Sequence, residues 1–229
     1  SDILDSDTYD SIYGQYRFNA GTADYLVGLK SFAEDRVLVF NRNSIHTIYG
    51  TTSIENAQVN LLTDEVGCVA RNSIIQVGSQ VIFLSDNGVY STRFMDEYNL
   101  RGSETPLSED INETIKRINR DHWDAAVATY FDSRYYIAVP LDNSTSNNAI
   151  LIYNFLNKQW ESIDTVDDAS WDIKNLLVAG EGNDKAVYAV NALGGIHRLD
   201  ARSGGIDYVV TQIGEPSQPH DIKACLLTR

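Results

Sequence analysis

The chain of 229 residues lacks several features that mark membrane, secreted or metal-binding proteins. No apolar run reaches about 18 residues, and the start of the chain carries no basic-then-apolar leader. We therefore expect neither a membrane-spanning helix nor a signal peptide. Because the chain begins at Ser1 rather than at a methionine, a piece of a longer protein is one expectation.

Cysteine is scarce, because Cys68 and Cys225 are the only two and no CxxC or Cys/His spacing joins them. This predicts reduced, buried thiols rather than a disulfide or a metal site, and synthesis in a reducing cytosol. Asp5, Asp7 and Asp10 are spaced loosely as in a calcium loop, but the glycine and distant glutamate of an EF-hand are missing. They are only a weak calcium candidate, and we expect no cofactor.

Positive charge is also sparse, since 18 Lys and Arg face 32 Asp and Glu, for a net charge of −14. A sequence-reading nucleic-acid binder would concentrate Lys and Arg on one face, so the balance argues against that class. It is compatible with a surface that repels a sliding polyanion, although solubility alone would also explain it.

Catalytic motifs are absent from the sequence, including GxSxG, HExxH, a Walker loop and a dinucleotide fingerprint. His46, Tyr90 and His197 hold the same place in three of the repeats, which predicts a packing position. Residues 85–88 come close to a sialidase-type Asp-box, but they are better explained as a hairpin turn whose left-handed backbone angles Asn87 and Gly88 accept at little cost. We therefore predict that the chain is not an enzyme.

Residues 124–164 contain four apolar runs of strand length, rich in Tyr, Ile, Val and Phe. The breakers between them are too short for crossover helices, so neighbouring strands must run antiparallel. The run 149–155 is apolar almost without alternation, which predicts a strand covered on both faces. Such a sheet of four strands, enclosed by similar sheets, describes a propeller blade.

Similar runs recur at intervals of about fifty residues, the period of propeller blades. The predicted fold is therefore all-β, a β-propeller of about four antiparallel four-stranded blades. The blades cover residues 22–213, approximately as 24–64, 68–100, 124–164 and 173–213. Residues 1–21 form an acidic leader or linker, and residues 214–229 a tail or a linker to missing sequence. Whether four blades close a ring stays open.

One inserted surface helix is predicted at residues 108–119. Ser108 is placed to cap its N-terminus, and Ile111, Ile115 and Ile118 fall on one face.

Three stretches resemble the tail nozzle protein of short-tailed bacteriophages, also called tail tubular protein B. Residues 35–45 read DRVLVFNRNSI, residues 67–73 with 81–91 read GCVARNS and VIFLSDNGVYS, and residues 132–139 with 148–155 read DSRYYIAV and NAILIYNF. The likeness covers about residues 24–164. The residues that carry it are Asp35, Arg36, Asn43, Ser44, Gly67, Cys68, Ser85, Asp86, Gly88, Tyr90, Arg134, Tyr135, Tyr136 and Trp160.

The resemblance implies a virion structural protein, made in the host bacterial cytoplasm and placed in the phage tail. It implies a hexameric tube that conducts DNA, with the portal adaptor, other tail proteins and passing DNA as partners. It supplies no catalytic residue. A tail-hub or stabilisation protein is an alternative. From other classes, a propeller glycan hydrolase and a host-binding module that grips with loop 141–148 stay open.

Overall fold

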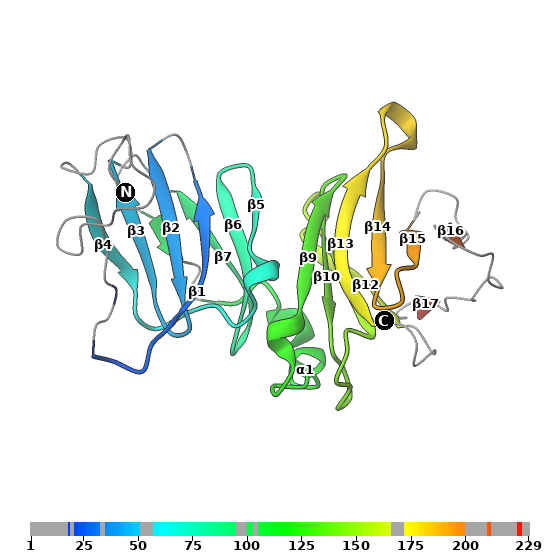
Figure 1. Ribbon diagram of the computed structural model, residues 1–229, viewed down its shortest axis with the longest axis horizontal. Coiled ribbons are helices and arrows are strands. Elements are labelled where there is room, and N and C mark those ends of the chain that lie inside the picture. Colours follow the sequence, from blue (N-terminus) through cyan, green and yellow to red (C-terminus); the bar gives the residue numbers. More distant parts are fainter. Residues whose placement is uncertain are drawn as a thin grey trace, which may run out of the picture. The chain divides into compact units, whose positions relative to one another are not determined.

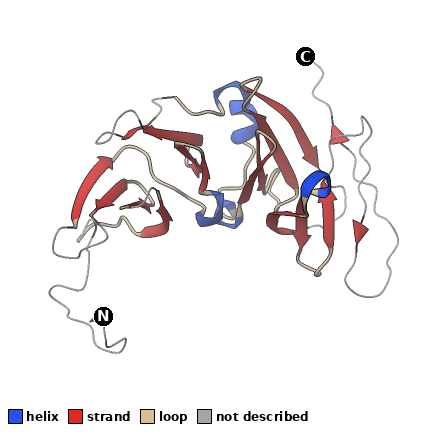
Figure 2. Ribbon diagram, turned by 90° about the horizontal axis from the view of Figure 1, so that it is seen from above, coloured by secondary structure: helices blue, strands red, loops and turns tan. Residues whose placement is uncertain are grey.

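The computed structural model describes residues 18, 21–32, 35–50, 57–94, 100–102, 105–165, 172–199, 210–211 and 224–225. Within these ranges the protein is all-β, with four antiparallel sheets and a few short helical turns (Figures 1 and 2). In each sheet the first four strands follow one another in chain order. The predicted fold, about four antiparallel four-stranded blades of a β-propeller-like architecture, is confirmed.

The strands begin and end close to the turn residues that separate the apolar runs. Sheet 1 contains β1 (Leu26–Ser31), β2 (Arg36–Asn41), β3 (Ile45–Tyr49) and β4 (Gln58–Thr63). Sheet 2 contains β5 (Ile75–Val77), β6 (Gln80–Ser85), β7 (Gly88–Phe94) and β8 (Leu100–Gly102). Sheet 3 contains β9 (Val127–Phe131), β10 (Arg134–Val139), β11 (Ala149–Asn154) and β12 (Gln159–Thr165). Sheet 4 contains β13 (Ile173–Ala179), β14 (Ala186–Asn191), β15 (Ile196–Leu199) and β16 (Val210–Thr211).

Two residues of the predicted C-terminal tail form a further strand that the sequence did not suggest. The strand β17 (Ala224–Cys225) pairs with Ile163 and Asp164 of β12, so sheet 3 has five strands. The leader proposed for residues 1–21 lies outside the described residues except at Phe18 and Gly21.

The chain divides into two compact units, Ser1–Cys68 and Val69–Arg229. The first contains sheet 1, whose buried residues include Leu38, Phe40 and Ile45. The second contains sheets 2, 3 and 4, and its β9 strand lies beside both β5 and β13. Each unit is described separately below.

Sheet 3 is covered on both faces within the second unit. Tyr135 and Ile137 point to one face and join a hydrophobic cluster with Leu84 of sheet 2. Tyr136 and its neighbours on the other face join a second cluster with Leu176 of sheet 4. All six residues of β11 are buried, as the run without alternation predicted. Each fully buried large aliphatic or aromatic side chain contributes roughly 1.5–3 kcal/mol, so the burial of both faces of sheet 3 stabilises this unit.

The two-residue hairpin loops after β6 and β9 differ in their backbone angles. Asp132 and Ser133 have φ of 48° and 60°, as in the type I′ turn that matches strand twist. In the loop between β6 and β7, Ser85 pairs with Gly88. There only Gly88 has a positive φ, of 133°, so the left-handed angles predicted for an Asn–Gly turn are wrong at Asn87.

The helix predicted at residues 108–119 is much shorter than the sequence suggested. It consists of a 3₁₀ turn (Glu109–Ile111) followed by α1 (Asn112–Ile115). Ser108 makes no capping hydrogen bond, so the predicted cap is wrong. Ile115 and Ile118 are buried in the cluster between sheets 2 and 3, so this insertion forms part of the core.

Candidate functional site

Four of the phage-like residues brace the chain around β2 and the turn that follows it. Ser44 Oγ donates to Asp24 Oδ2 at 2.6 Å, and the N–H of Asn43 donates to Asp24 Oδ1 at 2.8 Å. One carboxylate thus holds two adjacent residues of the turn. At the other end of β2, Arg36 Nε lies 3.6 Å from Asp35 Oδ1. Both arrangements are structural.

Gly67 and Cys68 hold the segment after β4 against the same turn. A Cβ atom on Gly67 would collide with the backbone of Arg42, so only glycine allows this approach. The N–H of Cys68 donates to the carbonyl of Asn41 at 2.9 Å. Cys68 is a buried free cysteine, as predicted, and Cys225 is described only as part of β17.

Gly88 marks a close approach between the β6–β7 hairpin and the insertion. Ser108 Oγ accepts a hydrogen bond from the N–H of Val89 at 3.0 Å. A Cβ atom on Gly88 would collide with that same oxygen. Ser108 therefore fastens the insertion to β7, a role that the capping interpretation missed because the partner lies 19 residues away.

Two aromatic residues of the resemblance connect sheet 3 to the chain before it. Tyr135 is fully buried, and its hydroxyl donates to the carbonyl of Ser73 at 3.1 Å. Trp160 Nε1 donates to the carbonyl of Leu107 at 3.0 Å. Each side chain packs in the cluster between sheets 2 and 3 while its polar end satisfies a backbone carbonyl.

An ion pair supports the start of β10. Arg134 Nε donates to Glu161 Oε2 at 2.7 Å, and Asn154 Nδ2 donates to the other carboxylate oxygen. Burial raises the pKa of Glu161, but these hydrogen bonds outweigh it and hold the pKa below its ordinary value. Burial also raises the pKa of the Tyr136 hydroxyl to about 12, which makes it a poor proton donor at neutral pH.

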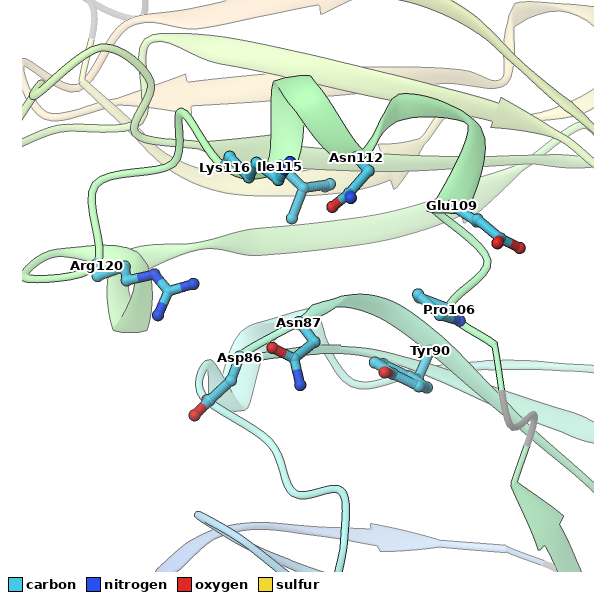
Figure 3. Close-up of a pocket in the computed structure, with 9 residues that line it drawn as sticks. All are labelled: Asp86, Asn87, Tyr90, Pro106, Glu109, Asn112, Ile115, Lys116 and Arg120. Carbon is cyan, nitrogen blue, oxygen red and sulfur yellow. The ribbon is translucent and has the colours of Figure 1, made fainter.

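A groove of about 430 Å³ lies between the β6–β7 hairpin and the insertion (Figure 3). Two carboxylates, a tyrosine and an arginine line it, as a glycan-cleaving site would need. In Figure 3, however, Asp86 and Glu109 lie at opposite ends and their carboxylates point away from each other. The lining residues are Asp86, Asn87, Tyr90, Pro106, Glu109, Asn112, Ile115, Lys116 and Arg120.

Loop 141–148 is fastened to the insertion rather than held free. Arg117 donates to both carboxylate oxygens of Asp142, at 2.8 and 2.5 Å. These bonds lower the pKa of the Asp142 carboxyl. Asn147 is buried and its amide nitrogen donates to two backbone carbonyls, those of Ala125 at 2.6 Å and Ile173 at 2.8 Å.

The repeated position of His46, Tyr90 and His197 is confirmed as a packing position. Each residue pairs with the fourth residue of the preceding strand in its sheet, and all three are buried. Burial lowers the pKa of His46, and Asp24 opposes that change.

Among the described residues, no group of three or more His, Cys, Asp or Glu side chains could hold a metal ion. The weak calcium candidate, Asp5, Asp7 and Asp10, lies outside them. In the same part of the chain, no helix is long and apolar enough to cross a bilayer.

No family model and no curated protein matches the chain. Among solved structures, the hemopexin fold protein CP4 from cow pea is 14% identical, with 82% of this chain and 92% of that chain covered and a TM-score of 0.35. A 2S albumin seed protein from Dolichos is 12% identical, with 89% and 94% covered and a TM-score of 0.38. AztD from Citrobacter koseri is 10% identical, with 81% and 62% covered and a TM-score of 0.34. These comparisons identify no family for the chain.

Proposed function

We propose that the protein is a virion structural component, a β-propeller-like part of the tail nozzle of a short-tailed phage. The observation that carries this proposal is the position of the phage-like residues. Gly67 allows the close approach of its segment to the backbone of Arg42. Tyr135 and Trp160 donate hydrogen bonds to backbone carbonyls far away in the sequence. Residues that fix distant segments to one another suit a protein whose role is to hold a shape.

Partners in this role are further copies of the chain, the portal adaptor and neighbouring tail proteins. DNA would pass through the assembly without being read. The net charge of −14 supports such passage, because an acidic wall repels the phosphate backbone. The hexameric state comes from the resemblance alone.

The fastened loop 141–148 favours this structural role over a host-binding module. Gripping loops commonly adapt to their partner, whereas the Asp142 carboxylate and the Asn147 amide nitrogen already make hydrogen bonds within the protein.

Labelling of phage particles with gold-conjugated antibodies against the chain tests the proposal. We expect label on tails, below the head, and a loss of infectious particles when the gene is deleted. Label absent from all particles, together with an unchanged titre after deletion, would contradict the proposal.

A second candidate, glycan cleavage, is favoured only by the lining of the groove. If it were right, purified protein would release reducing ends from host polysaccharide, and Asp86→Asn or Glu109→Gln would abolish the release. Because the two carboxylates point apart, we expect no release from the unmodified protein.

A further inference from the structure

The groove beside the β6–β7 hairpin has a size and a lining that suit a small polar ligand. Its volume of about 430 Å³ falls within the roughly 300–1,000 Å³ that is usual for ligand sites in proteins. Asp86, Asn87 and Tyr90 of the hairpin line one wall, and side chains of the insertion line the other (Figure 3). All nine lining residues belong to the second unit, so one part of the chain defines the groove.

Arg120, at one end of the groove, has a fixed position and unused hydrogen-bond donors. Its Cζ lies 5.5 Å from the centre of the Trp123 ring, so a cation–π contact holds the guanidinium without occupying its N–H groups. Arg117 and Arg134 donate to carboxylates, whereas Arg120 forms no ion pair with any described residue. In Figure 3 its guanidinium points into the groove. Such a guanidinium suits a carboxylate, which it can contact through two N–H groups.

Tyr90 supplies a second unused polar group, in the hairpin wall. The residue is 7% exposed and its ring is stacked on Phe83, yet its hydroxyl makes no hydrogen bond with another described residue. A buried hydroxyl usually has a partner, so an unpaired one that lines a groove indicates a ligand group beside it. Burial raises the pKa of Tyr90, so the hydroxyl keeps its proton and is available as a hydrogen-bond donor.

The remaining lining favours a ligand rich in hydroxyl groups. The side-chain amides of Asn87 and Asn112 each carry two N–H donors and a carbonyl acceptor. Sugar hydroxyls also donate and accept, so they can pair with both amides and with the Tyr90 hydroxyl. Aliphatic side chains are few here, Pro106 and Ile115, which argues against a fatty acid or another largely apolar carboxylate.

We propose that this groove binds an acidic sugar of the uronic acid class, without cleaving it. The sugar carboxylate pairs with the Arg120 guanidinium, and its hydroxyls bond to the Tyr90 hydroxyl and the two amides. The sugar stays intact, because Asp86 and Glu109 lie at opposite ends of the groove with their carboxylates pointing apart. The inference goes beyond the proposed function and does not depend on it.

An NMR titration of the isotope-labelled full chain with glucuronate and galacturonate oligosaccharides tests the inference. We expect saturable shifts of the Arg120 Nε–H signal and of the side-chain amide signals of Asn87 and Asn112. Glucose oligosaccharides lack the carboxylate and acetate lacks the hydroxyls. Each should therefore bind at least about tenfold more weakly than the uronates.

Four variants locate the sugar in the groove. Arg120→Ala should weaken uronate binding by at least about tenfold, because it removes the partner of the carboxylate. Tyr90→Phe removes only a hydroxyl without a partner, so it should weaken binding about two- to tenfold and leave unfolding unchanged. Asp86→Asn removes a negative charge at the Arg120 end of the groove, so it should strengthen binding. Arg71→Ala is the matched control, since Arg71 is exposed and does not line the groove, and it should bind as the unmodified protein does.

No saturable binding of either uronate oligosaccharide would overturn the inference. Equally tight binding of glucose oligosaccharides or of acetate would also overturn it, because the groove would then recognise a neutral sugar or a lone anion. Uronate binding that a folded Arg120→Ala variant retains in full would place the sugar elsewhere. Reducing ends released from the oligosaccharides would contradict binding without cleavage.

Discussion

Asn147 should be among the most sensitive polar residues of the protein. Its amide nitrogen donates to the carbonyls of Ala125 and Ile173. In return, the N–H of Ile173 donates to the backbone carbonyl of Asn147 at 3.1 Å. The side chain is 1% exposed, so water cannot replace these bonds. It therefore joins the segment before β9 to the first residue of β13.

Asn147→Ala removes both side-chain hydrogen bonds and leaves the carbonyl of the buried residue Ile173 with one donor fewer. A lost hydrogen bond costs about 0.5–1.5 kcal/mol, and a buried group left without its partner about 1–3 kcal/mol, so we expect a loss of about 2–4 kcal/mol. Asn147→Asp should cost more at neutral pH, because a carboxylate would face two carbonyl oxygens.

Urea unfolding followed by circular dichroism measures this loss. Asn183→Ala, at an exposed position between β13 and β14, is the control and should change the unfolding free energy by less than about 0.5 kcal/mol. An equally small change for Asn147→Ala would refute the reasoning that this amide joins the two sheets.

Three further substitutions test other joints by the same unfolding assay. Gly88→Ala should cost about 2–3 kcal/mol from its positive φ and the collision with Ser108 Oγ, and adding Ser108→Ala should cost less than the sum of the two single changes. Lys158→Gly should gain about 0.5–1 kcal/mol, because Lys158 has a φ of 53°, and Lys158→Ala should show no such gain. Burial raises the pKa of Asp164, so the folded state holds that proton more tightly and ionisation costs stability as pH rises. Asp164→Asn should therefore stabilise the protein at about pH 7 and not near pH 3; a gain of the same size at both values would contradict this.

The sequence predicted the strands well, because alternation and turn residues are local signals. The strand β11, Ala149–Asn154, agrees with the predicted run 149–155 to within one residue. The sequence also predicts the two-residue turn at Asp132 and Ser133, because these are the only two residues between the apolar runs on either side.

Contacts between distant segments could not be predicted from the sequence. The hydrogen bonds from Asn147 to Ile173 and from Arg117 to Asp142 join residues about 25 positions apart. The sequence around a polar residue in a loop does not indicate which distant residue it will bond. Ser108 was misjudged for the same reason. A serine before an acidic turn resembles a helix cap, but tertiary contact with Val89 decided its role.

Native mass spectrometry of the full protein tests the assembly role most directly. The account predicts complexes of several identical copies, six if the phage-tail resemblance extends to the assembly. A protein that stays monomeric and also cleaves host polysaccharide would contradict it.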